Sequence, residues 1–368
     1  MRIHFRVFET WRLSAALLIM SWHFLRFAPP GHEAASAGLY RLMPLMEMFF
    51  MISGFLIMIR YADELLESAA TYRHFIVRRI ARFYPLYLVT LGFFVVVAVA
   101  VDLGIVGTED DGRYAWSALI PNILMIQAWG ATDTLTFNYV SWSMSAEWFC
   151  YLLLPIIVLT WQRYGLAGLM IFALASVVAM ELGVIYGVIP FESWLQANTW
   201  GAYRAFADFS LGALVAMAVV RSRLSFKSHW PGWITFTLAV VAMTTLQDSY
   251  VIVGLLGLAM FLSALAERNN PAGAQWLAPL HPLGRVSLGI YLIHPVIEAI
   301  FFSILWRKLI EPTDTIGFYV YWLIPMAATI GIAILSERYF EGPAARYIGS
   351  RWGGGRQKSV RATTLPAE

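Results

Sequence analysis

The stretch FYPLYLVTLGFFVVVAVAV, residues 83–101, holds no charged side chain between Arg82 and Asp102. A helix of about 20 apolar residues crosses a bilayer, because each residue adds about 1.5 Å and the hydrocarbon core is about 30 Å thick. The apolar residues are continuous and lack the alternation of a barrel strand. The stretch is therefore predicted to be a transmembrane helix.

Comparable stretches recur along the whole chain. Of its 368 residues, 59% are hydrophobic and only 13% are charged, and the mean hydropathy is +0.65. A soluble domain carries about 25% charged residues, so a water-soluble globule is excluded. We predict an all-α polytopic membrane protein, a bundle of about ten transmembrane helices. The predicted spans are 9–27, 40–60, 80–103, 138–161, 165–189, 203–221, 231–247, 249–267, 285–308 and 316–338.

The basic residues are distributed unevenly between the two sides of this bundle. With the N-terminus inside, 18 of the 26 Lys and Arg residues fall in cytosolic segments and five on the opposite side. Cytosolic loops are enriched in Lys and Arg, so both termini are predicted to be cytosolic. Residues 1–348 are predicted to form the membrane domain. Residues 349–368, rich in Gly and basic residues, are predicted to be a disordered cytosolic tail.

Two polar residues share one face of the first span. Arg12 and His23 are eleven residues apart, which is close to three whole helical turns and about 16 Å along the axis. An arginine at the cytosolic entrance suits a phosphate-bearing ligand, and a histidine deeper in the membrane suits proton transfer. Snorkelling of Arg12 and an interhelical hydrogen bond of His23 are the structural alternatives.

Two further motifs lie within the second span and at the cytosolic end of the third. Ser53-Gly54 in the second span is small enough to let a ligand or another helix approach the backbone. Arg79 and Arg82 begin the third span and are three residues apart, an arrangement that matches phosphate oxygens. Helix packing and topological anchoring, respectively, are the competing explanations.

The fourth span begins with Trp142-Ser143-Met144-Ser145-Ala146-Glu147, which places Ser143 and Glu147 on one face. Because this span enters from outside, Glu147 is predicted to reach the depth of His23, where it could orient the imidazole. Glu147 could instead be a buried structural carboxylate.

Three polar motifs lie in or beside later spans. In the ninth span His294 precedes Pro295, and could line a substrate path or cap a proline kink. Arg204 and Asp208 are predicted to form an ion pair within one helix. Glu341-Gly342-Pro343 is predicted to be a helix terminus.

The order and spacing of these motifs resemble the acyltransferase-3 family of integral membrane O-acyltransferases. The resemblance rests on Arg12-x10-His23, on Phe49-Phe50-Met51-Ile52-Ser53-Gly54-Phe55, on Arg79-x-x-Arg82 and Pro85, on Trp142-Ser143-x-Ser145-x-Glu147, on Leu211-Gly212, and on Ser287-x3-Tyr291-Leu292-x-His294. It covers nearly the entire chain. The Trp11-Arg12 opening is similar to members that decorate exopolysaccharides.

The resemblance implies an acyl-coenzyme A donor, usually acetyl-CoA, and a carbohydrate hydroxyl as acceptor, in a bacterial inner membrane. It implies that Arg12, Arg79, Arg82, Ser53 and Gly54 bind the donor. We expect His23 to be the general base, with Glu147 orienting it, and Ser143, Trp142 and His294 to contact the substrate. Ser53 or Ser143 could instead carry the acyl group or donate to the oxyanion.

We expect no metal ion and no nucleic acid as partner, but the lipid bilayer and, as further candidates, a second copy or polysaccharide-assembly proteins. The alternative function is a transporter or flippase of a glycan or lipid-linked precursor, for which charges within the membrane are equally natural. A non-catalytic subunit of a polysaccharide export complex is a third reading.

Overall fold

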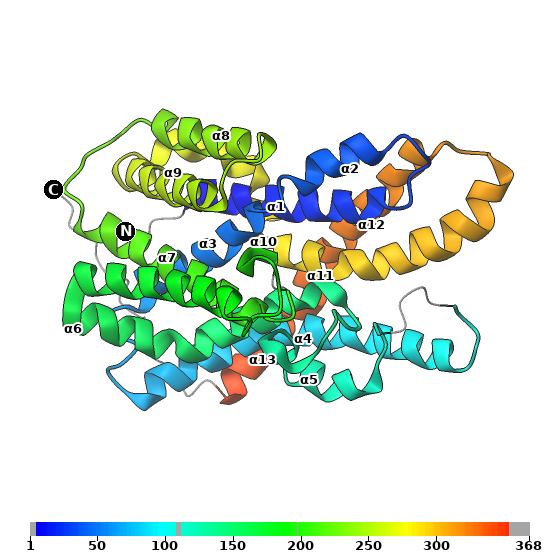
Figure 1. The fold of residues 1–368 in the computed structure, drawn as a ribbon, viewed down its shortest axis with the longest axis horizontal. Helices are drawn as coiled ribbons and strands as arrows, with labels where there is room; N and C mark the ends of the chain where they lie inside the picture. Colours follow the sequence, from blue (N-terminus) through cyan, green and yellow to red (C-terminus); the bar gives the residue numbers. More distant parts are fainter. Residues whose placement is uncertain (1–4, 108–111, 197, 353–368) are drawn as a thin grey trace.

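The computed structural model describes residues 5–107, 112–196 and 198–352. Every regular element in these ranges is helical, and Figure 1 shows the helices packed side by side in one bundle. The α-helices are α1 (Arg6–Leu25), α2 (Glu33–Tyr40), α3 (Leu45–Tyr61), α4 (Ala69–Asp102), α5 (Leu119–Ile123), α6 (Trp142–Ile185), α7 (Gly201–Arg221), α8 (Trp230–Thr244), α9 (Ser249–Asn269), α10 (His281–Arg285), α11 (Ser287–Ile297), α12 (Phe318–Ser336) and α13 (Gly342–Trp352). Shorter 3₁₀ or π segments are η1 (Trp116–Ala118), η2 (Gln127–Ala131), η3 (Tyr139–Ser141), η4 (Trp194–Gln196), η5 (Pro271–Leu280), η6 (Glu298–Ile310), η7 (Glu311–Thr313) and η8 (Glu337–Glu341).

Several of these helical segments are long and apolar enough to cross a membrane. Among the described residues there are seven: Glu33–Tyr61, Ala69–Asp102, Tyr139–Ile185, Gly201–Arg221, Ser249–Asn269, Ser287–Thr313 and Phe318–Trp352. The all-helical, multi-pass architecture is confirmed, whereas the number of about ten spans is not. The remaining predicted spans correspond to α1, whose first two turns are charged, to α8, which has only 15 residues, and to the division of α6.

The division of α6 falls at Gly165. A straight helix of 44 residues would be about 66 Å long, more than twice the thickness of the hydrocarbon core. Gly165 has φ +61° and ψ −152°, a conformation that is essentially restricted to glycine. Figure 1 shows α6 folding back on itself at one end of the bundle. The turn coincides with the predicted boundary between spans 138–161 and 165–189.

Helices α3 and α7 cross at backbone contact. A Cβ added to Gly54 would lie 2.1 Å from the carbonyl oxygen of Phe209, and one added to Gly212 would lie 1.9 Å from that of Met51. Each glycine therefore admits the backbone of the other helix, as small residues do in membrane helix pairs. Gly54 was predicted to bind the donor, but the structure assigns it to this crossing.

The C-terminal helices correct two predictions. The chain does not end its helix at Glu341-Gly342-Pro343, because α12 continues through the π segment η8 into α13. Helix α13 extends to Trp352, so residues 349–352 of the predicted tail are helical. The remainder of that tail, 353–368, lies outside the described residues.

Candidate active site

A cavity of about 1360 Å³ lies between α1, α4, α11, η6 and the connection before α6. We call it the outer cavity, after the side to which the predicted topology assigns it. Ligand pockets usually enclose about 300–1,000 Å³, so this one has room for a bulky substrate. His23 and Trp142, both predicted site residues, line it.

His23 stands in the wall of the outer cavity with aromatic neighbours. Its ring centroid lies 4.8 Å from that of Tyr139 and 5.2 Å from that of His294. The side chain is 8% exposed, and its Nδ1 atom has no hydrogen-bond partner among the described residues. Nδ1 is therefore buried without a partner, which leaves Nε2 as the ring nitrogen that could exchange a proton with a substrate.

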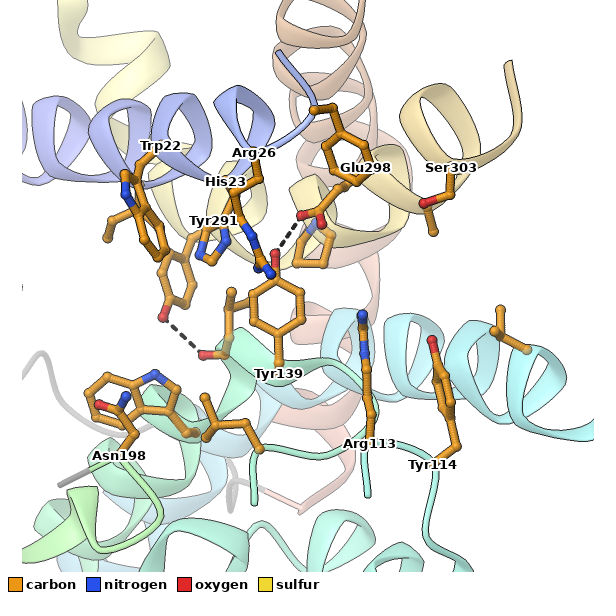
Figure 2. Close-up of a pocket in the computed structure, with 18 of the residues that line it drawn as sticks. Trp22, His23, Arg26, Arg113, Tyr114, Tyr139, Asn198, Tyr291, Glu298 and Ser303 are labelled. Atoms are coloured by element: carbon orange, nitrogen blue, oxygen red, sulfur yellow. Dashed lines mark hydrogen bonds between the residues drawn. The ribbon is translucent and has the colours of Figure 1, made fainter. Parts of the chain in front are cut away.

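A carboxylate lies beside this histidine, on η6. The hydroxyl of Tyr139 donates to Oε2 of Glu298 at 2.5 Å, and Figure 2 shows the pair bordering the pocket near His23. Glu298 follows His294 by four residues, so the two share one face of the α11–η6 helix. The histidine, the tyrosine and the carboxylate form a polar patch within an apolar bundle.

A second, narrow cavity of about 20 Å³ lies deeper toward the predicted cytosolic side. We call it the inner cavity. Ser53 donates from Oγ to Oε1 of Glu147 at 2.5 Å there. Nε of Arg12 is buried and has no hydrogen-bond partner in the described chain, while its guanidinium group lies 5.4 Å from the ring centroid of Phe49. The lining residues are Arg12, Met46, Phe49, Phe50, Ser53, Ser143, Met144, Glu147, Leu288 and Tyr291.

The two cavities share part of their walls. Met46 and Tyr291 line both of them, and we call this pair the shared wall. Tyr291 is held in place because its hydroxyl donates to the carbonyl oxygen of Val140 at 2.9 Å, a bond drawn in Figure 2. The inner and outer cavities are thus neighbours that have these two side chains in common.

The predicted pairing of His23 with Glu147 is wrong. His23 lines the outer cavity, whereas Glu147 lines the inner cavity and is bound to Ser53. Equal depth, estimated from helix position, did not reveal that Met46 and Tyr291 lie between the two cavities. The carboxylate that borders the outer cavity near His23 is Glu298.

The two arginines of α4 have different surroundings. Arg79 is partly buried, with its guanidinium group 5.7 Å from the ring centroid of Tyr151, and its Nε is another buried nitrogen without a hydrogen-bond partner among the described residues. It lies within electrostatic range of Glu147. Arg82 is ion-paired with Glu337 at 2.6 Å. Of the two, Arg79 has the buried nitrogen without a described partner, whereas Arg82 is engaged by Glu337.

The remaining predicted site residues are Ser143, Trp142 and His294, and they lie in different places. Ser143 lines the inner cavity and donates to the carbonyl oxygen of Val140 at 3.2 Å. Trp142 lines the outer cavity, and the guanidinium group of Arg204 lies 5.3 Å from its ring. His294 is fully buried behind His23.

The sequence had suggested an ion pair between Arg204 and Asp208, but Arg204 pairs with a different carboxylate. Its guanidinium group makes a two-pronged ion pair with Glu47 of α3, donating from Nε to Oε2 at 3.0 Å and from a second nitrogen to Oε1. A bidentate contact to the neighbouring helix satisfies the planar fork better than the i, i+4 geometry within one helix.

Four residues near His23 were not singled out from the sequence: Arg26, Arg113, Tyr139 and Glu298. Glu298 could have been found, because it is a carboxylate inside the predicted span 285–308 and lies four residues after His294. Arg26 and Arg113 could also have been found, because they are basic residues on the outer side of the predicted topology, where basic residues are disfavoured.

Comparison with known proteins agrees with the family resemblance seen in the sequence, and it does so over almost the whole chain. The model of an acyltransferase domain, Acyl_transf_3, matches residues 7–338. The chain belongs to the acyltransferase-3 family. It is a multi-pass membrane acyltransferase that transfers groups other than aminoacyl groups.

Two curated relatives of this acyltransferase span nearly its full length. Nodulation protein 10 of Rhizobium leguminosarum bv. viciae is 25% identical, over 93% of this chain and 94% of the relative. Acyltransferase MdmB of Streptomyces mycarofaciens is 24% identical, over 92% of this chain and 91% of the relative. No solved structure matches the chain.

Proposed function

We propose that this acyltransferase is an O-acetyltransferase of the bacterial inner membrane. It moves an acetyl group from cytosolic acetyl-CoA to a hydroxyl group of a cell-surface or exported carbohydrate. The observation that carries the proposal is the shared wall, because Met46 and Tyr291 place an arginine-bearing cavity on the predicted cytosolic side next to the cavity that contains His23.

The donor side fits an anionic cosubstrate. Arg12 and Arg79 each keep a buried Nε without a hydrogen-bond partner among the described residues. Leaving such a donor unsatisfied costs about 1–3 kcal/mol, a cost that a phosphate oxygen would remove. In this proposal Arg12 and Arg79 hold the phosphates of the donor, which supplies the acyl thioester. Arg82 contributes mainly through its ion pair with Glu337.

The acceptor side fits general-base catalysis. His23 takes the proton of the acceptor hydroxyl as the new ester C–O bond forms and the thioester C–S bond breaks, and it returns the proton to the departing thiolate. Tyr139 packs against the imidazole and is itself fixed by Glu298. In this role Glu298, acting through Tyr139, replaces the carboxylate that the sequence had assigned to Glu147.

Acetyl transfer can be measured directly. Purified full-length protein is supplied with radiolabelled acetyl-CoA and candidate glycans, and label in the glycan is counted. His23→Gln is expected to lower the transfer rate at least about 100-fold, the usual contribution of a general base. Its matched control is His32→Gln, because the ring of His32 forms an exposed hydrogen bond with the carbonyl oxygen of Pro29 and lines neither the outer nor the inner cavity.

A His23→Gln variant that retains full transfer while staying folded would remove His23 from the chemistry. Movement of a glycan across vesicles without any acetylation would favour the transporter alternative. Retained insertion and abundance of the variant, checked by gel filtration, separate lost chemistry from lost folding.

A further inference from the structure

The outer cavity is markedly cationic. Arg26, Arg113, Arg307 and Lys308 line it, against one carboxylate, Glu298. Within the described ranges, no carboxylate lies within ion-pair distance of Arg26, Arg113 or Lys308. The fifth cation in the wall, Arg204, is neutralised by Glu47.

These cations are exceptional for their side of the membrane. The predicted topology assigns five basic residues to the outer side, and four of them line this cavity. Membrane proteins disfavour basic residues in short outer loops, so their concentration at one cavity is not explained by topology. It is explained if the cavity receives a negative charge.

Two of the cations lie close to the reacting histidine. The guanidinium group of Arg113 is 4.8 Å from the ring centroid of Tyr139, and that ring is 4.8 Å from His23. Figure 2 shows Arg26 and Arg113 projecting into the pocket from opposite walls. A planar guanidinium group binds phosphate and carboxylate oxygens with two parallel hydrogen bonds.

We propose that the acceptor of this acyltransferase carries an oxyanion, a phosphate or a carboxylate, which Arg26 and Arg113 bind while a hydroxyl of the same molecule reaches His23. The inference rests on the proposed function and specifies its substrate class. The anion cannot be that of the donor if the donor enters from the cytosolic side, because the inner cavity and the shared wall lie between. The volume of about 1360 Å³ leaves room for several sugar rings beyond the charged group.

Binding of small probes tests this proposal independently of turnover. Methyl glucoside, methyl glucuronide and methyl glucoside 6-phosphate are titrated into the full chain in a non-ionic detergent, and affinities are taken from thermal stabilisation. The two charged probes are expected to bind at least about tenfold tighter than methyl glucoside, the effect of one charge-assisted hydrogen bond. Equal binding of all three probes would overturn the proposal.

Substitutions locate the preference. Arg113→Gln and Arg26→Gln are each expected to reduce the advantage of the charged probes about tenfold, while Arg113→Lys, which keeps the charge, retains part of it. Arg41→Gln is the matched control: Arg41 belongs to the same predicted side but bonds the carbonyl oxygen of Thr244 and does not line the cavity. An undiminished preference in both glutamine variants would overturn the assignment.

Two further outcomes separate the inference from the proposed function. Anion preference without acetyl transfer to any probe would support the oxyanion site and reject the acetyltransferase. Transfer to methyl glucoside as fast as to the charged probes, unchanged in Arg113→Gln, would support the acetyltransferase and reject the oxyanion site. If only short-chain phosphatidylglycerol bound, the cations would serve a lipid headgroup, and the acceptor proposal would fall.

Discussion

Arg79 and Arg82 belong to one motif and lie about one turn apart on α4, yet their side chains do different work. Nε of Arg79 is buried and unpartnered among the described residues, whereas Arg82 donates to Glu337 at 2.6 Å and to the carbonyl oxygen of Arg285 at 3.0 Å. Arg82 is also 37% exposed, so solvent weakens what its charge can contribute. The spacing of the two arginines predicted that both bind the donor. Their different partners in the structure indicate two separate roles.

This difference predicts unequal effects on donor binding. Arg12→Gln and Arg79→Gln are each expected to raise the KM for acetyl-CoA about tenfold, because each removes a buried donor that faces a phosphate in the proposed complex. Arg82→Gln is expected to change it less than about threefold, because its charge is already engaged and partly exposed. Steady-state kinetics at saturating acceptor measures both. A larger effect at Arg82 than at Arg12 would restore the interpretation taken from the motif.

Among the elements, the crossing of α3 and α7 positions one residue in the wall of the inner cavity, Ser53. Ser53 lies next to Gly54, so the hydroxyl that binds Glu147 is placed by the same contact that brings Phe209 against α3. The pattern of small residues predicted close approach, but not whether a ligand or a helix makes it. The answer depends on α7, which lies about 150 residues later in the chain. The spacing of residues within one span carries no information about a contact with so distant a helix.

The crossing also makes a prediction about stability. Gly212→Ala is expected to lower the free energy of unfolding by about 1–3 kcal/mol, the usual cost of overpacking, because the new methyl group would meet the carbonyl oxygen of Met51. Gly92→Ala on α4 is the matched control, since a Cβ there meets nothing within 4 Å and alanine favours a helix. Thermal unfolding in detergent compares the two variants. Equal melting temperatures of the two variants would contradict the prediction, because α3 and α7 would then accommodate the extra methyl group at no cost.

For the whole molecule, the sequence predicted the helical membrane bundle well, because continuous apolar stretches have one stable solution in lipid. It predicted the pairing of site residues poorly. Glu147 and His23 lie on helices whose relative rotation depends on packing, and Glu147 binds Ser53. Arg204 likewise forms its ion pair with Glu47 of another helix and not with Asp208 of its own. Contacts along one helix follow from spacing, whereas contacts between helices follow from the complete bundle.

The orientation of the bundle is still a prediction, and one structural feature makes it simple to test. Cys150, the single cysteine, is buried, so an introduced cysteine can be labelled alone. A membrane-impermeant maleimide added to intact cells is expected to label Glu192→Cys and not Ser225→Cys, both exposed positions in loops assigned to opposite sides. Labelling of Ser225→Cys alone would invert the topology and place His23 on the cytosolic side.

The shared wall has a consequence for the cell's energy supply. An uninterrupted, arginine-lined passage from one face of the membrane to the other would conduct small ions and dissipate the proton gradient. We expect Met46 and Tyr291 to interrupt such a passage, because both line the two cavities and the hydrogen bond from Tyr291 to Val140 holds the tyrosine in place.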